Sequence, residues 1–507
     1  MSGLEIGLAL PGIIDLCLRY GKAIVTAYKD FKHANEEVEE RKLAIDAAWA
    51  KTSEQLAFLR RVWDRLSENY RDLQSRMLRH FEKKLEAAVR ELSKLDNQAA
   101  KSGSRLLGKS KAAKYALLKK ESLDRAIQNL RVWQNEFDTT WYLVLLMADE
   151  AIDKALVKRI GTEKLSVARH VRSALRPELQ RETTIFLSGS KLQSARRSEI
   201  PYSTSEVIEI AGVGTFILDS ADCSSRKDAT TFSKNVRSLA MRLQQVDANG
   251  FHLLKCHGVA RITDPSTKQL LSFDFIFNFP QGYQKPQSLR SHLLSRATHS
   301  LSDRFSLAKQ LATSVSYIHV LEFVHKNIRP ETILIFEGAG PHLGLLYLLG
   351  FRAFRMAENK TLRLGNSIWS ENIYQHPDRQ GSNPRVDYVM QHDIYSLGVC
   401  LLEIGLWDSL VSSEGDANVS LLAGVNCDPS AFNRDSSLKD HFMTLAKKQL
   451  PIRMGEMYTQ VVVNCLTCMD QTNEDFGDES EFEDGDGILI GVKYIEKILL
   501  LLGEITV

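Results

Sequence analysis

Cysteine is scarce in this chain of 507 residues, and its placement argues against disulfide bonds. The seven cysteines are odd in number and scattered: Cys17, Cys223, Cys256, Cys400, Cys427, Cys465 and Cys468. A disulfide framework is therefore not expected, and a reducing compartment fits better. Cys465 and Cys468 form a close pair, but no second pair of Cys or His follows at the spacing of a zinc site. We expect this pair in a buried helix, as small apolar side chains.

Long apolar runs and targeting signals are also lacking. No stretch of 18 or more uncharged apolar residues occurs, so a constitutive transmembrane helix is not expected. Residues 1–5 hold no basic residue ahead of the first apolar run, and residue 2 is Ser, so neither a secretory signal nor N-myristoylation is indicated. The expected location is the cytoplasm, and the length predicts two or three domains.

The first apolar run, residues 6–18, contains Asp15 as its only charged residue. It is too short to span a bilayer alone, yet more apolar than an ordinary first helix. Two states are compatible with it: a helix packed into the core of its own domain at rest, and a segment that enters a membrane once released. The candidate lipid-contacting residues are Leu8, Leu10, Ile13, Ile14, Leu16 and Leu18.

Residues 36–70 show the clearest helical periodicity. Apolar or small residues recur there at spacings of three and four, at Ile45, Trp49, Thr52, Leu56, Leu59, Trp63 and Leu66. This stripe is typical of a helix in a bundle. Two further amphipathic helices are predicted at about 73–95 and 116–150. With the N-terminal helix, they predict a four-helix bundle over residues 1–150.

A basic loop is predicted between the third and fourth helices. Residues 101–120 contain no acid and seven cations: Lys101, Arg105, Lys109, Lys111, Lys114, Lys119 and Lys120. A solvated charge run and attraction to anionic lipid headgroups both explain it. Nucleic acid is not favoured as a partner, because no aromatic residues alternate with the charges for base stacking. Residues 151–200 remain charged, and we expect a helical linker or brace ending near Pro201.

The pattern changes after residue 201. Residues 207–218 predict two strands and a turn, 231–246 a helix, and 251–262 and 270–279 two more strands. From residue 288 the pattern is mainly helical. A small mixed lobe (about 201–280), a connector and a larger helical lobe (about 284–507) predict a two-lobed α+β domain.

Residues 325–335 resemble the catalytic loop of protein kinases, H-R-D-L-K-P-E-N. In that family the Asp accepts the substrate proton and the Asn binds magnesium. Three positions that matter for catalysis differ in this chain: Asn327 replaces the Asp, Arg329 the Lys and Thr332 the Asn. An amide is not a base comparable with a carboxylate, so the resemblance implies a kinase frame without its chemistry.

Other motifs extend the resemblance along residues 200–507. Residues 347–352 match the D-F-G region, with Gly350 in place of the metal-binding Asp, and residues 374–378 match the end of the activation segment. Residues 393–399 match the start of the long buried helix. The retained positions that the family uses to brace the fold are His325, Pro330, Phe351, Asp393, Ser396 and Gly398.

The small lobe also lacks groups that phosphoryl transfer requires. Asp219 falls where the family has its phosphate-binding Lys, and no Glu occurs between Glu209 and Glu322, so the Lys-binding helix Glu is missing. Gly212 and Gly214 are a poor match to the glycine-rich loop and better fit a turn. We therefore expect a pseudokinase and not an enzyme, with no metal and no cofactor; residual ATP binding stays a less favoured alternative.

The order of bundle, brace and pseudokinase resembles HeLo-type fungal cell-death executioners and the mixed lineage kinase domain-like family of necroptosis effectors. The resemblance implies a bundle that acts at membranes, with anionic lipids as partners, and a pseudokinase that restrains and triggers it. It also implies a homo-oligomer on activation and an upstream signalling protein that the sequence does not identify. Two alternatives remain: a pseudokinase scaffold whose bundle binds a protein, and a residual ATP-dependent kinase.

Residues 470–486 hold nine carboxylates and no cation. A solvated insertion explains this acidic tract, and the alternative is that it masks the basic loop at rest.

Overall fold

The protein is described by a computed structural model covering residues 10–29, 36–66, 68–101, 185–187, 192, 194–223, 229–295, 297–338, 340, 342–356, 368–411, 437–473, 475–476 and 494–505. The chain forms two compact units, Met1–Ser166 and Val167–Val507.

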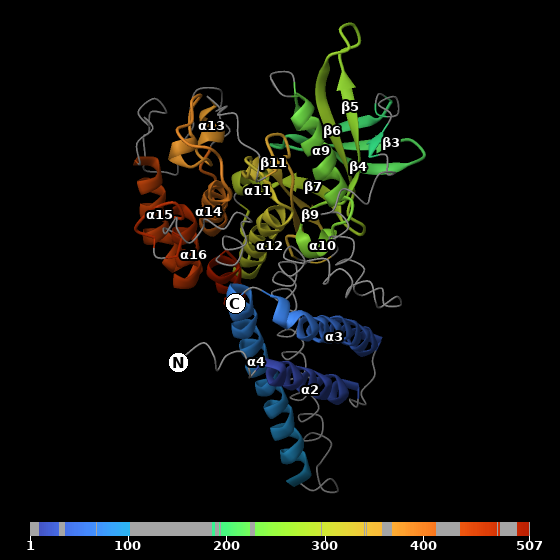
Figure 1. Ribbon diagram of the computed structural model, residues 1–507, viewed down its shortest axis with the longest axis vertical. Coiled ribbons are helices and arrows are strands. Elements are labelled where there is room, and N and C mark those ends of the chain that lie inside the picture. The colour runs from blue at the N-terminus through green and yellow to red at the C-terminus, as the bar shows by residue number, and fades with distance from the viewer. Residues whose placement is uncertain are drawn as a thin grey trace. The chain divides into compact units, whose positions relative to one another are not determined.

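The described part of the first unit is helical. Its elements are α2 (Leu10–Lys29), α3 (Glu36–Val62), the short turn η1 (Trp63–Arg65) and α4 (Glu68–Lys101) (Figure 1). The predicted inward face of α3 is confirmed where the structure describes its side chains, because Thr52, Leu56 and Leu59 are all buried. The helix predicted at 116–150 lies outside the described residues, so the four-helix bundle stays a prediction. Of the helices in the described ranges, none has the length and hydropathy needed to cross a bilayer.

Helix α2 packs against both of the other helices. A Cβ built on Gly21 would lie 1.9 Å from the indole Cη2 of Trp49, so only glycine allows α2 and α3 this approach. On the α4 side, the Cys17 thiol donates to the carbonyl of Leu78 at 3.8 Å. The inward face of α2 is therefore fixed by close packing.

A mixed six-stranded sheet forms the small lobe of the second unit. Its strands are β1 (Phe186–Leu187), β2 (Arg196–Glu199), β3 (Ser205–Ile210), β4 (Gly214–Asp222), β5 (Cys256–Thr263) and β6 (Leu270–Asn278). They lie in the order β1-β5-β6-β4-β3-β2, and all pairs are antiparallel except β1 with β5. The predicted helical linker over 151–200 is wrong for its described end, where β1 and β2 join this sheet. All four residues of β2 are exposed at the sheet edge, so no apolar alternation marks the strand in the sequence.

Both faces of the sheet carry buried side chains. One face carries the apolar cluster Leu192, Ile208, Phe216, Leu218, Ala260 and Ile276. On the opposite face, α9 (Ala229–Leu243) places Phe232 against Phe273, with ring centroids 6.0 Å apart. Because successive side chains of a strand alternate between faces, Asp219 of β4 lies on the α9 side, away from Phe216 and Leu218.

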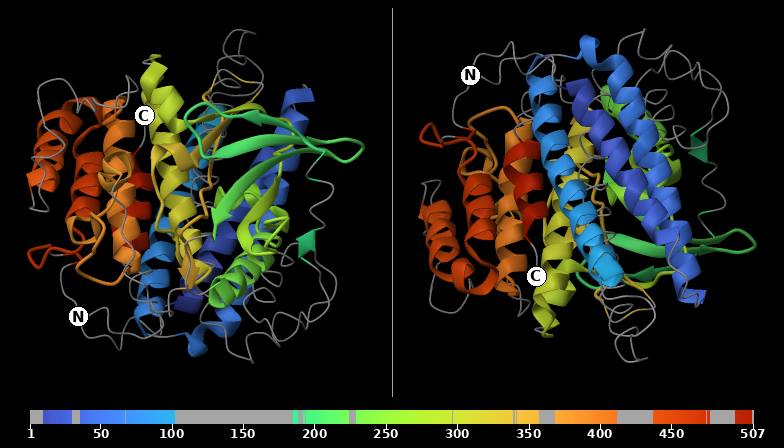
Figure 2. Two further views of the ribbon diagram at one scale, coloured as in Figure 1. Left: turned by 90° about the horizontal axis from the view of Figure 1, so that it is seen from above. Right: turned by 90° about the horizontal axis from the view of Figure 1, so that it is seen from below.

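Helices build the larger lobe, and Figure 2 shows its main helices running side by side. They are α11 (Leu289–Ser295), α12 (Leu301–Val320), α13 (Trp369–Asn372), α14 (Met390–Leu406), α15 (Ser437–Met454), α16 (Glu456–Leu466) and α18 (Leu500–Glu504), with the 3-10 helix η5 (Pro377–Arg379) and the π-helix η7 (Ile495–Leu499). The short helix α10 (Ala248–Phe251) lies between α9 and β5 in the chain. Gly398 lets α14 approach α16, because a Cβ there would lie 2.6 Å from the Cβ of Cys465. Cys465 in α16 and Cys468 just after it are buried, as predicted.

Candidate functional site

Short strands place the predicted catalytic-loop region at the centre of the second unit. The chain runs through β8 (Phe323–Val324), η4 (Pro330–Thr332), β9 (Ile333–Glu337), β10 (Leu345–Leu348) and β11 (Arg355–Met356). β9 pairs with β10 and with β7 (Gln284–Ser288), while β11 pairs with β8. The turns at both ends of β9 therefore bring residues 325–332 next to residues 349–352.

Asp393 at the start of α14 fixes the first turn of this loop. Its carboxylate accepts the backbone N–H groups of His325 and Lys326 at 2.7 and 2.9 Å, and the hydroxyl of Tyr388 at 2.7 Å. The His319 ring lies 3.1 Å away. Burial favours the neutral acid, but the hydrogen bond and the electrostatic interaction with the His319 ring outweigh it and hold the pKa of Asp393 below its usual value. The loop thus rests on a buried, ionised carboxylate.

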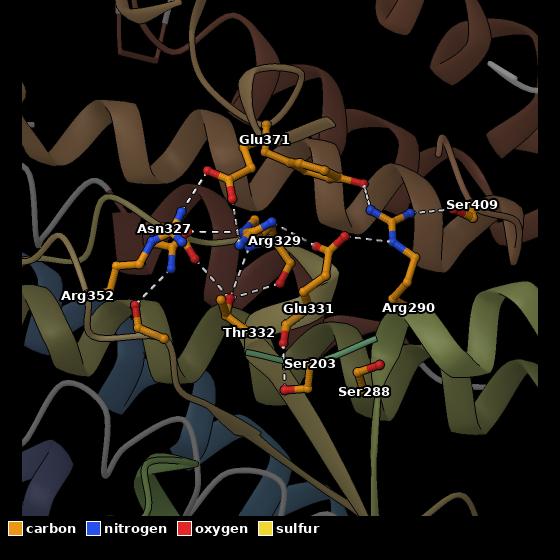
Figure 3. Close-up of polar contacts among 12 residues, drawn as sticks. Ser203, Ser288, Arg290, Asn327, Arg329, Glu331, Thr332, Arg352, Glu371 and Ser409 are labelled. Carbon is orange, nitrogen blue, oxygen red and sulfur yellow. Dashed lines mark hydrogen bonds and ion pairs between the residues drawn. The ribbon is translucent and has the colours of Figure 1, made fainter. Parts of the chain in front are cut away.

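Asn327, Thr332 and Gly350 lie together, and their polar groups are hydrogen-bonded to one another or to adjacent backbone. The Asn327 amide donates to the carbonyl of Gly350 at 3.0 Å, and the Thr332 hydroxyl lies 2.9 Å from the carbonyls of Asn327 and Arg329 (Figure 3). Gly350 adopts φ +86°, and a Cβ there would lie 2.3 Å from Cγ2 of Thr332. The space where a side chain at position 350 would extend is therefore filled.

Asp219 joins the sheet to the same cluster. Its Oδ2 accepts the backbone N–H groups of Gly350 at 3.1 Å and Phe351 at 2.8 Å. Burial raises the pKa of Asp219 to about 6, and the two N–H groups oppose that rise. A carboxylate that accepts hydrogen bonds thus occupies the position at which the sequence predicts the counterpart of the kinase Lys.

The Phe351 ring packs this centre against aromatic side chains of β6 and the His325 ring. Its ring lies 6.3 Å from Phe275 and 6.0 Å from Phe277 on β6, and 5.0 Å from the His325 ring, measured between centroids. Phe351 is 2% exposed. The cluster of Asp219, Gly350 and Phe351 is therefore packed on its inner side by aromatic rings.

The loop between β2 and β3 (residues 200–204) is hydrogen-bonded to the larger lobe. The Ser203 hydroxyl donates to the carbonyl of Glu331 at 3.0 Å, and the Ser288 hydroxyl donates to the carbonyl of Pro201 at 2.7 Å. In protein kinases a glycine-rich loop covers the nucleotide phosphates. Gly212 and Gly214 instead form the turn from β3 to β4, as the sequence favoured.

These residues do not fit the magnesium ion that the kinase family uses. Gly350 offers no side-chain ligand, and the hydroxyl of Thr332 is engaged by two backbone carbonyls. Magnesium requires near-octahedral oxygen ligands, commonly carboxylates. No step through a metal can be derived from this arrangement.

Charged side chains of alternating sign form an ion-pair chain beside the cluster (Figure 3). In order, its members are Arg352, Glu371, Arg329, Glu331, Arg290 and Glu403. The successive N–O distances are 2.7, 3.1, 3.8, 3.1 and 3.0 Å. The ion-pair chain thus consists of three arginines and three glutamates in alternation.

The inner end of the ion-pair chain is the most buried. The side chains of Arg290 and Glu403 are 3% and 0% exposed, and Arg290 also binds Ser409 and the Tyr374 hydroxyl. Burial raises the pKa of Glu403 to about 7, while Arg290 opposes the shift. Tyr374, at the end of the predicted activation segment, is thereby tied to α14.

The structure brings together the predicted positions of the second unit and leaves most predicted membrane positions undescribed. Asn327, Arg329, Thr332, Gly350 and Asp219 form one centre, with His325 and Phe351 beside it; Pro330 begins η4, and the Ser396 hydroxyl donates to the carbonyl of His392 at 3.0 Å. In α2, Ile14 is buried and Ile13, Leu16 and Leu18 are half-buried. Leu10 and Lys101 end described helices, but their side chains are not described. Leu8, Arg105, Lys109, Lys111, Lys114, Lys119 and Lys120 lie outside the described residues.

Sequence reasoning missed the ion-pair partners Glu371, Arg290 and Glu403. Glu331 offered one signal, since it belongs to the catalytic-loop motif, but its partners come from segments far apart in the chain. Two acids of the acidic tract also have partners within the second unit: Asp470 pairs with Lys439, and Asp475 pairs with Lys497 at 2.7 Å.

Comparison with known proteins gives two kinase relatives. No family model matches the chain. It is 22% identical over 148 residues to serine/threonine-protein kinase PrkC of Bacillus subtilis (strain 168), covering 29% of this chain and 21% of that protein. It is 25% identical over 154 residues to a Mycoplasma pneumoniae protein named "Putative serine/threonine-protein kinase", covering 28% and 40%. The chain thus matches well under half the length of these relatives. These distant similarities and the two-lobed architecture support a protein-kinase-like domain in the second unit.

Proposed function

We propose that the second unit is a pseudokinase that regulates the helical first unit, which acts at membranes in regulated cell death or incompatibility. One observation carries the pseudokinase part. The groups at the positions of catalysis, Asp219, Asn327, Thr332 and Gly350, hydrogen-bond to one another or to adjacent backbone.

Phosphoryl transfer depends almost wholly on positioning and on electrostatic stabilisation of developing negative charge. Asn327 is an amide and already donates to Gly350, so it provides no base. Asp219 contributes a carboxylate where a cation is needed, and this would repel nucleotide phosphates. The centre thus lacks the base, the metal ligands and the strand Lys that binds nucleotide phosphates in kinases.

The membrane part is supported by the packing of α2 and by the HeLo resemblance. Ile14 and Ile24 of α2 are each 1% exposed, so these apolar side chains can meet lipid only after α2 leaves its neighbours. A regulator that loosens this packing would expose the apolar side of α2 to anionic lipid. The released helices of several copies of this chain would then associate into a homo-oligomer.

Two measurements test the two parts. The full chain should show no thermal stabilisation by ATP with magnesium and no autophosphorylation, with an active kinase as positive control; phosphate incorporation would refute the pseudokinase part. Anionic liposomes should leak more with the unit spanning 1–166 than with the full chain. If that fragment ignores the liposomes, a scaffold whose helices bind a protein becomes the better explanation.

A further inference from the structure

Glu371 of α13 is held between two guanidinium groups. Arg329 Nη2 lies 3.1 Å from Oε1, and Arg352 Nη2 lies 2.7 Å from Oε2, so each carboxylate oxygen has its own arginine (Figure 3). The three residues come from the catalytic-loop region, the segment after β10 and the segment before η5. The two arginines therefore converge on one anion from separate parts of the fold.

These side chains form a site that is buried at Arg329 and Glu371 and accessible to solvent at Arg352. Arg329 and Glu371 are 8% and 10% exposed, whereas Arg352 is 39% exposed. Arg329 is also held in place, because its Nε donates to Oδ1 of Asn327 at 3.0 Å. A fixed, largely buried arginine beside a more exposed one is suited to an anion that approaches from the Arg352 side.

The contacts of the ion-pair chain also indicate that the ligand of the two arginines is an anion. Glu371 is the one glutamate of the ion-pair chain that contacts both Arg329 and Arg352. Without Glu371, Arg329 keeps one carboxylate of the ion-pair chain, that of Glu331 at 3.8 Å. A phosphate monoester carries up to two negative charges and three acceptor oxygens, and planar guanidinium groups bind such groups well.

We propose that Arg329 and Arg352 form a binding site for a phosphate monoester, and that Glu371 occupies this site in the resting protein. The proposal deepens the pseudokinase part of the proposed function and rests on it, because the centre recognises phosphate without transferring it. A phosphorylated side chain is the favoured source, since the loop 200–204 is hydrogen-bonded to Glu331 and Ser288 and the Asp219 carboxylate would repel nucleotide phosphates. Binding would displace Glu371 and with it α13.

The test uses the full chain and the substitution Glu371→Gln, which removes the competing charge and keeps the shape. Inorganic phosphate, O-phosphoserine and AMP are titrated at constant ionic strength, with EDTA present, while the unfolding midpoint is followed. Glu371→Gln should reach half-saturation with phosphate and O-phosphoserine at about tenfold lower concentration than the natural sequence, since one charge-assisted competitor is gone. AMP should bind no better than inorganic phosphate.

Two variants serve as controls. Glu337→Gln removes a carboxylate from an exposed pair with Lys285 (3.5 Å) and should leave the phosphate response unchanged. Arg352→Gln, added to Glu371→Gln, should abolish the gain. Equal responses in Glu371→Gln and Glu337→Gln, or a gain that survives Arg352→Gln, would overturn the proposal. AMP binding well above inorganic phosphate would overturn the favoured source.

A second measurement needs no substitution at Glu371. In the natural sequence, saturating phosphate should raise backbone hydrogen exchange across α13 (Trp369–Asn372) and leave β9 unchanged, because Glu371 loses its arginines. Unchanged exchange in α13 would contradict the displacement. This result is independent of the autophosphorylation test, so the two proposals can fail separately.

Discussion

The Asp219 carboxylate accepts the backbone N–H of Phe351 at 2.8 Å, and this hydrogen bond joins β4 of the small lobe to the segment after β10. The same oxygen accepts the N–H of Gly350, and Asp219 is 1% exposed. Burial raises its pKa to about 6, so folding at neutral pH must keep a buried carboxylate ionised. The contact positions the loop but costs desolvation energy.

Asp219→Asn should therefore stabilise the protein at neutral pH. An amide oxygen can accept both N–H groups and carries no charge to desolvate. A folded pKa above the unfolded value means that the contribution of Asp219 is full below about pH 4 and is lost as the pH rises through about 6. The gain of the variant should approach 3 kcal/mol above pH 7, since two pKa units correspond to about that energy, and should vanish near pH 4.

Urea unfolding of both proteins between pH 4 and 8 measures this difference. A gain that stays constant with pH would show that Asp219 is not the titrating group. A loss of stability at pH 7 would mean that the ionised carboxylate strengthens its two hydrogen bonds by more than burial costs.

Gly350→Ala tests whether the metal position is sterically closed. Gly350 and Gly212 have similar φ angles of +86° and +73°, but a Cβ at Gly212 has nothing within 4 Å, while one at Gly350 lies 2.3 Å from Thr332. Gly212→Ala should cost about 1 kcal/mol for the left-handed backbone. Gly350→Ala should cost about 1–3 kcal/mol more, because Thr332 must move.

The free energy of unfolding of both variants gives the comparison, and Thr332→Ser in the Gly350→Ala background should recover part of the loss. Equal costs at the two glycines would contradict a closed site. An aspartate at position 350 would then be tolerated, and the metal site could be rebuilt.

The part of this centre that the sequence predicts lies in short local motifs. Asn327, Thr332 and Gly350 were placed by their neighbours in short motifs, and the structure brings them together. The ion-pair chain could not be predicted, because Arg290 and Glu403 are 113 positions apart and charged residues are common on any surface. The edge strand β2 was missed for a related reason: its residues are all exposed, and a strand with no buried face has no periodicity of two.

Arg290→Met should strongly destabilise the second unit. It would leave Glu403, which is 0% exposed, without its cation, and an unpaired buried charge costs about 3–5 kcal/mol. Adding Glu403→Gln should recover a large part, since the burial cost of the charge is removed. The free energies of unfolding of both single variants and the double variant give the coupling.

Arg197→Met is the matched control. Arg197 pairs with Glu206 at 3.3 Å, but the two side chains are 45% and 33% exposed. Its removal should change stability by less than about 1 kcal/mol. Similar losses for Arg197→Met and Arg290→Met would indicate that the inner end of the ion-pair chain is far better solvated than its burial implies.

Helix α2 offers the sharpest test of the membrane part, because two of its glycines differ in their surroundings. A Cβ at Gly21 would lie 1.9 Å from Trp49, whereas a Cβ at Gly12 has nothing within 4 Å. Gly12→Ala should stabilise the helix by up to about 1 kcal/mol. Gly21→Ala should push α2 from α3 and destabilise the first unit by about 1–3 kcal/mol. In the full chain, leakage of anionic liposomes should therefore rise with Gly21→Ala and stay level or fall with Gly12→Ala. If Gly21→Ala loosens α2, as hydrogen exchange would show, and leakage does not rise, release of this helix is not the route to the membrane.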